Sequence, residues 1–151
     1  MPVKGKEEHD REMAEKAAAT VPADLDPFEL PDRFAPEDRE SFAKGVSAFR
    51  GGDFYLAHDL WEEVWHAYRP ADRRFLQGLI HIAVGSYHVQ CGNAKGSFSQ
   101  LGKAVDKMSP FAPVQWGIDV NDLVARVARL RAEAVDSPAI GSCLDHVREG
   151  L

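Results

Sequence analysis

From about residue 37 onward, apolar residues recur at every third or fourth position, which is the spacing of one face of an α-helix. The glycine pair 51–52 ends the first such segment. Asp53 is a suitable N-cap for the second segment, which Pro70 closes. Helices are predicted at about 37–49, 54–68, 71–90, 94–108 and 120–130, with a short sixth near 140–147. No segment alternates strictly as a β-strand would, so we expect an all-α, single-domain helical bundle of about five to six helices, with antiparallel neighbours.

The fourth predicted helix shows how these segments are recognised. Asn93 is a suitable cap for it. Its apolar residues form a single stripe: Ala94, Phe98, Leu101, Val105 and Met108. We expect this stripe to face the core.

The N-terminal part of the chain has a different pattern. Residues 1–20 are charged and have no apolar face, so they form either a frayed helix or a disordered tail. Prolines at 22, 27, 31 and 36 rule out a continuous helix in residues 21–36. Large apolar residues lie between the prolines: Leu25, Phe28, Leu30 and Phe34. We therefore expect 21–36 to be an extended strap across a bundle domain of residues 37–151.

Composition narrows the class of protein. The 151 residues carry a formal net charge of −6, which argues against a nucleic-acid binder, since such proteins normally have a basic face. The two cysteines, Cys91 and Cys143, are far apart in sequence and form no zinc-binding or disulfide pattern. The N-terminus lacks a signal peptide, and no apolar stretch reaches membrane-spanning length. We expect a cytoplasmic protein with no nucleic-acid or membrane partner.

The stretch FYLAHDLWEEVWHAY, residues 54–68, places two polar groups beside an aromatic face. On a helical wheel, Trp61 and Trp65 lie within a wide apolar arc. Three polar residues fall on the opposite, solvent-facing side: Asp59, Glu63 and His66. His58 and Glu62 lie at the edge of the arc, where a side chain is partly desolvated and can still be reached by a ligand.

The next helix, predicted at 71–90, is apolar around most of its circumference. One narrow stripe differs: Arg74, Gln77, Gly78, His81, Gly85 and His88. Each helical glycine costs about 1 kcal/mol relative to alanine, so the pair indicates close approach of a bulky group. We expect Trp61 or Trp65 to fill this groove. Such docking would bring Gln77, His81 and His88 toward His58 and Glu62.

At these residues the sequence resembles a known family. His58, Glu62 and Trp65 match the pattern H-x-x-x-E-x-x-W, and further matches are Q-G-L-I at 77–80 and G-N-x-x-G at 92–96. These motifs resemble the domain of unknown function 309 family of bacterial and archaeal proteins, over roughly residues 40–108. Asp59 stands where family members often have glutamate. The resemblance implies an all-helical fold, no established activity, and a motif that has been suggested to bind metal.

Two interpretations of the pair follow. Histidine and glutamate at i and i+4 can hold one divalent metal ion, with His81 or His88 as a further ligand and water in an open position. The predicted cleft lining is then Gln77, Arg74, Trp61 and Trp65. In the alternative, Glu62 accepts a hydrogen bond from His58 and pairs with Arg74, as a structural polar cluster in a protein-interaction or homo-oligomer module. The sequence names no substrate, small-molecule ligand or reaction.

Overall fold

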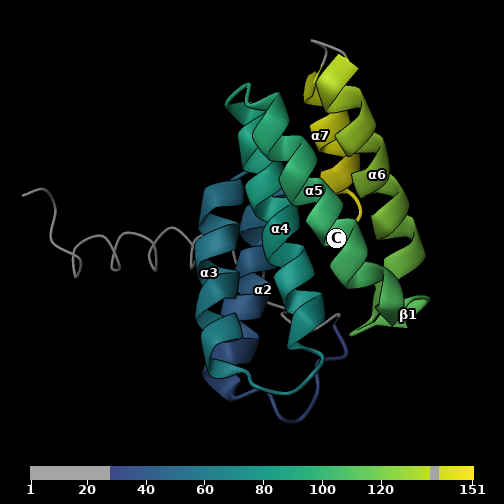
Figure 1. Cartoon of the computed structure of the whole chain (residues 1–151). Coiled ribbons are helices and arrows are strands. Elements are labelled where there is room, and N and C mark those ends of the chain that lie inside the picture. Colours follow the sequence, from purple (N-terminus) through teal and green to yellow (C-terminus); the bar gives the residue numbers. More distant parts are fainter. Residues whose placement is uncertain (1–27, 137–139) are drawn as a thin grey trace, which may run out of the picture.

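The computed structural model describes residues 28–136 and 140–151. The charged tail and the first part of the predicted strap, including Leu25, lie outside the described residues. Within the described part, six α-helices account for most of the chain: α2 (Pro36–Arg50), α3 (Phe54–Ala67), α4 (Arg73–Gln90), α5 (Ala94–Met108), α6 (Val120–Asp136) and α7 (Ile140–Arg148). The predicted all-α bundle is therefore confirmed (Figure 1).

The predicted caps begin the helices that surround the candidate site. The Asp53 side chain accepts a hydrogen bond from the Leu56 N–H at 3.2 Å, which starts α3. The Asn93 side chain does the same for the Gly96 N–H at 2.9 Å, which starts α5. Gly92, with φ 74°, supplies the left-handed turn between α4 and α5. Residues 91–93 thus connect the two helices, and the rest of the segment GNAKGS is the first turn of α5.

The helices pack in chain order, and each one contacts the next (Figure 1). α4 lies in the middle, where one side contacts α3 and the other contacts α5. The helices α2 to α6 all contribute large side chains that are fully buried: Trp61, Phe42, Phe49, Phe54, Phe75, Leu79, Leu101, Met108 and Leu123. This central position means that α4 has two faces on which neighbouring helices pack.

The described part of the predicted strap packs against the bundle. Phe34 is only 2% exposed, and its ring lies against those of Phe42, Tyr68 and Trp116. The Arg39 guanidinium donates a hydrogen bond to the Pro31 carbonyl at 2.6 Å. An apolar anchor and a charged donor therefore both hold residues 30–34 against α2.

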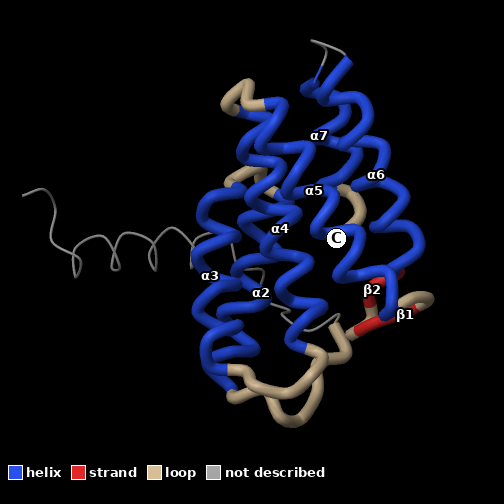
Figure 2. Tube along the Cα trace, in the orientation of Figure 1, coloured by secondary structure: helices blue, strands red, loops and turns tan. Residues whose placement is uncertain are grey.

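A small hairpin follows the short 3₁₀ turn Ser109–Phe111, and no strand was expected there. Strand β1 (Val114–Gln115) pairs antiparallel with β2 (Ile118–Asp119) (Figure 2). The expectation was wrong because two-residue strands are too short to show an alternating pattern. The turn places Trp116 at φ 52° and buries it in the core.

The predicted stripe of α5 needs a correction at its first two positions. Leu101 and Met108 are fully buried, whereas Ala94 is exposed and Phe98 is 43% exposed. The Arg131 guanidinium of α6 lies 3.5 Å from the centroid of the Phe98 ring and covers it. Residues 97 and 104 are buried in place of these positions, so the core-facing stripe is rotated from the predicted one.

Candidate metal site on helix α3

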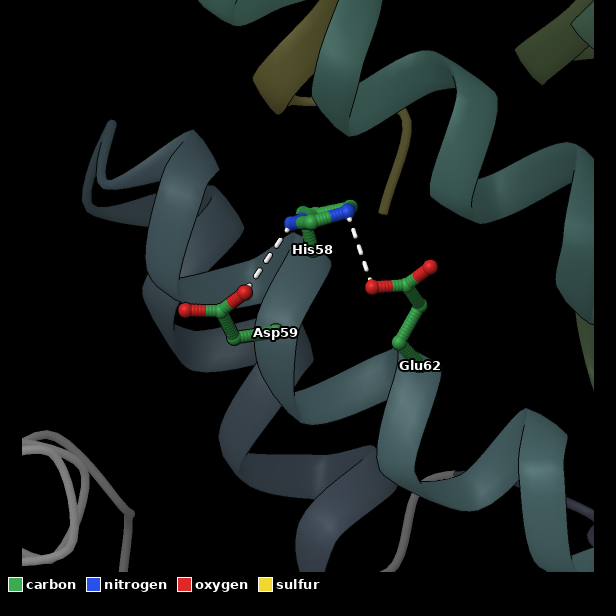
Figure 3. A group of neighbouring side chains, drawn as sticks. All are labelled: His58, Asp59 and Glu62. Carbon is green, nitrogen blue, oxygen red and sulfur yellow. Dashed lines mark ion pairs between the residues drawn. The ribbon is translucent and has the colours of Figure 1, made fainter. Parts of the chain in front are cut away.

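His58 lies between two carboxylates of its own helix. Its Nδ1 is 3.1 Å from an oxygen of Asp59, and its Nε2 is 3.1 Å from an oxygen of Glu62. Figure 3 shows the two carboxylates on opposite edges of the imidazole ring. One ligand atom from each of the three residues can be chosen so that all three lie within 4.8 Å of one another. The sequence-predicted pair, His58 and Glu62, is therefore brought together, and Asp59 joins it.

The cluster is partly desolvated and still open to water. The exposed fractions of the three side chains are 22% for His58, 25% for Asp59 and 44% for Glu62. The Tyr55 ring packs against the imidazole with 5.7 Å between centroids, and it also meets Tyr87 of α4 at 5.4 Å. The site thus lies at the edge of the α3–α4 contact, as its place at the margin of the apolar arc predicted.

Asp59 was expected to be solvated on the face opposite the apolar arc, but its side chain is only 25% exposed and lies beside His58. Helical geometry does turn the Cα–Cβ bond of Asp59 about 100° from that of His58. The imidazole, however, extends beyond the helix surface, and its Nδ1 comes within reach of the neighbouring carboxylate. Contacts between adjacent residues follow no helical periodicity rule, so the sequence pattern carried no signal for this one.

Two acceptors face one imidazole, which limits the protonation states that satisfy the cluster. A neutral imidazole has one N–H and one unprotonated nitrogen. Only one of the two 3.1 Å contacts can then contain a proton, and the other sets a nitrogen lone pair against a carboxylate oxygen. The second contact becomes favourable when a cation fills it, either a second proton or a metal ion. A positive charge at one edge of the ring would therefore stabilise the cluster.

The glycine stripe of α4 faces α5, which corrects the predicted docking. A Cβ atom at Gly78 would lie 2.2 Å from the Met108 Cγ, and one at Gly85 would lie 2.6 Å from the Leu101 Cδ2. The predicted close approach exists, but residues of α5 make it and the tryptophans of α3 do not. Trp61 instead packs over Gly45 of α2 and donates its indole N–H to the Phe42 carbonyl at 3.2 Å.

Because the stripe faces α5, its histidines have partners away from His58. His81 Nδ1 lies 2.7 Å from the Gln100 side-chain oxygen. His88 Nδ1 lies 3.3 Å from the side-chain nitrogen of Asn93. Burial lowers the pKa of His81 below its ordinary value. The structure thus places both predicted histidine ligands outside the group formed by His58, Asp59 and Glu62.

The predicted lining residues are also distributed differently. Arg74 is exposed, and among the described residues it forms no ion pair with Glu62. Its neighbour Arg73 stacks on the Trp65 ring at 3.8 Å and donates to the Trp65 carbonyl at 2.9 Å. Gln77 is half-buried on the stripe that faces α5. The arginine that contacts α3 is thus Arg73, whereas Arg74 was the predicted one.

None of the helices that the structure describes has the length and apolar character needed to cross a membrane. The expected cytoplasmic location stays a prediction.

Among known proteins, the sequence matches one family model and no protein of curated function. Residues 42–99 match the family model described as Domain of unknown function (DUF309). The match contains His58, Glu62 and Trp65, the residues of the H-x-x-x-E-x-x-W pattern. The matched family is the one that the H-x-x-x-E-x-x-W pattern indicated.

Proposed function

We propose that His58 and Glu62 bind a divalent metal ion and that Asp59 holds the imidazole ring in place. The observation that carries the proposal is the pair of 3.1 Å contacts on opposite edges of one imidazole. A metal ion at one ring nitrogen and a proton at the other would satisfy both carboxylates at once. Metal-binding histidines commonly donate their second N–H to a carboxylate in this way.

The metal belongs on the Glu62 side of the ring. Histidine and glutamate at i and i+4 share one helical face, which is the spacing of helical metal ligands. Bonds of about 2.0–2.2 Å place neighbouring ligands of one ion about 3.0–3.4 Å apart. The observed 3.1 Å between Nε2 and the Glu62 oxygen falls within that separation. The Asp59 carboxylate then accepts a hydrogen bond from the Nδ1–H of His58.

The donor set also suits a particular class of ion. One imidazole and one carboxylate favour Zn²⁺ and related divalent transition metals over Ca²⁺ or Mg²⁺, which prefer shells made of oxygen. Glu62 is 44% exposed, so water can reach this side of the cluster and complete the coordination. Open positions of this kind are where catalytic metal ions hold water.

Calorimetric titration of chelator-treated protein with Zn²⁺ tests the site. One ion should bind per chain, and His58→Gln and Glu62→Gln should each lose at least about tenfold in affinity, because each removes a ligand. Asp59→Asn should keep the stoichiometry and weaken binding about 10–100-fold. The matched control is His66→Gln, which removes an exposed histidine from the same helix and should leave binding unchanged.

The structural interpretation of the cluster makes opposite predictions. If a proton alone fills the second contact, Zn²⁺ will not raise the melting temperature of the wild-type protein, and His58→Gln will lower that temperature with or without the ion. That result, or an equal loss of binding in His66→Gln, would overturn the proposal. The homo-oligomer expectation stays a separate prediction, which light scattering tests.

A further inference from the structure

We propose that the groove between α5 and α6 is the surface through which two copies of this chain form a symmetric dimer. The two helices lie side by side (Figure 1). The groove between them has a volume of about 240 Å³, and its lining includes Phe98, Val105 and Asp106 of α5 and Ala128 and Arg131 of α6. The proposal gives the homo-oligomer expectation a specific surface and does not depend on the metal site on α3.

The groove contains apolar surface that the chain itself leaves uncovered. Phe98 is 43% exposed, although the Arg131 guanidinium lies 3.5 Å from the centroid of its ring. Val105 is only partly buried. The side chains of Ala128 and Ala132 on α6 are small and exposed, so another helix can approach closely there. Apolar surface bordered by charged residues is typical of a protein-interaction site.

Charged side chains border this surface at its two ends. Arg131 lies at the Phe98 end, where its Nε donates to the Phe98 carbonyl at 2.9 Å. Asp106 lies eight positions after Phe98 on α5 (106 − 98), which is about 12 Å along a helix that rises 1.5 Å per residue. Within the described residues, neither Arg131 nor Asp106 forms an ion pair. Each end of the groove therefore presents one charge without a counter-charge.

A two-fold axis through the middle of the groove brings these ends together. The two α5 helices then run antiparallel, so that Arg131 meets the partner's Asp106 and Phe98 meets the partner's Val105. Each contact occurs twice, because a two-fold interface uses the same surface on both copies. The apolar contacts favour association, and the paired charges fix the antiparallel alignment. This self-complementarity favours a second copy of the chain over a different protein as the occupant of the groove.

Sedimentation velocity over a series of protein concentrations tests the dimer, with a chelator present to exclude association through bridging metal ions. The wild-type chain should shift from monomer to dimer as its concentration rises. Arg131→Glu and Asp106→Arg should each weaken dimerisation about tenfold or more, because each sets like charges against one another at both ends. Glu37→Arg is the matched control, because it makes the same change of charge as Asp106→Arg at an exposed position of α2 and should leave the dimer intact.

The double variant Arg131→Glu with Asp106→Arg should dimerise again, because the exchanged charges are still complementary. A folding defect caused by losing the Arg131 contacts within one chain would not be repaired in this way. A wild-type chain that stays monomeric at every concentration would overturn the proposal and leave the groove to a different protein. A double variant that dimerises no better than the single variants would also overturn it, as would a dimer that both single variants leave intact.

Discussion

Replacing Gly85 by alanine should destabilise the protein, because this glycine lets α4 approach α5. The added Cβ would lie 2.6 Å from the Leu101 Cδ2 and 2.7 Å from its Cγ. Favourable carbon–carbon contacts lie at about 3.5–4.0 Å, so about 1 Å of separation is missing. Leu101 cannot simply swing aside, because it is fully buried and its backbone nitrogen lies 3.3 Å from the same point. The helices must move apart.

The magnitude follows from two opposing effects. Overpacking a core contact costs about 1–3 kcal/mol, whereas alanine gains about 1 kcal/mol over glycine inside a helix. Gly102→Ala in α5 is the matched control, since the nearest atoms to its Cβ would be those at the guanidinium end of the Arg131 side chain, which is long and flexible. The propensity gain is common to both variants. Gly85→Ala should therefore be less stable than Gly102→Ala by about 1–3 kcal/mol.

Urea denaturation followed by circular dichroism measures this difference, provided that the free energy of unfolding falls with urea concentration at the same slope in both variants. The close approach also predicts coupling, so the double variant Gly85→Ala with Leu101→Ala should be less destabilised than the sum of its parts. Equal stability of Gly85→Ala and Gly102→Ala, within about 0.5 kcal/mol, would refute the reasoning. Strict additivity with Leu101→Ala would do the same.

Two further predictions concern the strap and the pH dependence of stability. Phe34→Ala should lower the free energy of unfolding by about 3–5 kcal/mol, because it empties a site enclosed by other aromatic rings; a loss below about 1 kcal/mol in urea denaturation would contradict this role. His81 has a lowered pKa in the folded protein, so the unfolded chain binds more protons in the window that begins near pH 6.5 and extends downward. Its contribution to stability is therefore complete above that window and lost as pH falls through the folded pKa. His81→Gln should have a shallower decline of unfolding free energy between pH 7.5 and 5, and an unchanged decline would count against the assignment.

The sequence predicted the helices well because their signals are local. Caps such as Asp53 and Asn93 act within one turn, and the hydrogen bonds that start α3 and α5 are those expected from these residues. The position of His58 and Glu62 at the margin of an apolar arc is also a property of one helix. Side-chain exposure in the structure agrees with that position.

The arrangement between helices was beyond such reasoning. α4 is apolar on nearly all sides, so its pattern does not say whether the glycine stripe meets α3 or α5. Assigning it to α3 placed His81 and His88 in the metal site, whereas the structure pairs His81 with Gln100. Gln100 itself carried no sequence signal, because an isolated polar residue on a helix is ordinarily solvated. The hairpin around Trp116 was missed for a different reason, since its strands are too short to form a pattern.

The strap and the hairpin join at a contact between distant parts of the chain. The Glu29 N–H donates to the Trp116 carbonyl at 3.1 Å, across a separation of 87 positions (116 − 29). The entropy of closing so long a loop opposes this contact until the helices between its ends have assembled. We therefore expect the Phe34–Trp116 contact to form late in folding, after the local helical contacts. An ordered strap therefore indicates that the chain up to and including the hairpin has already folded.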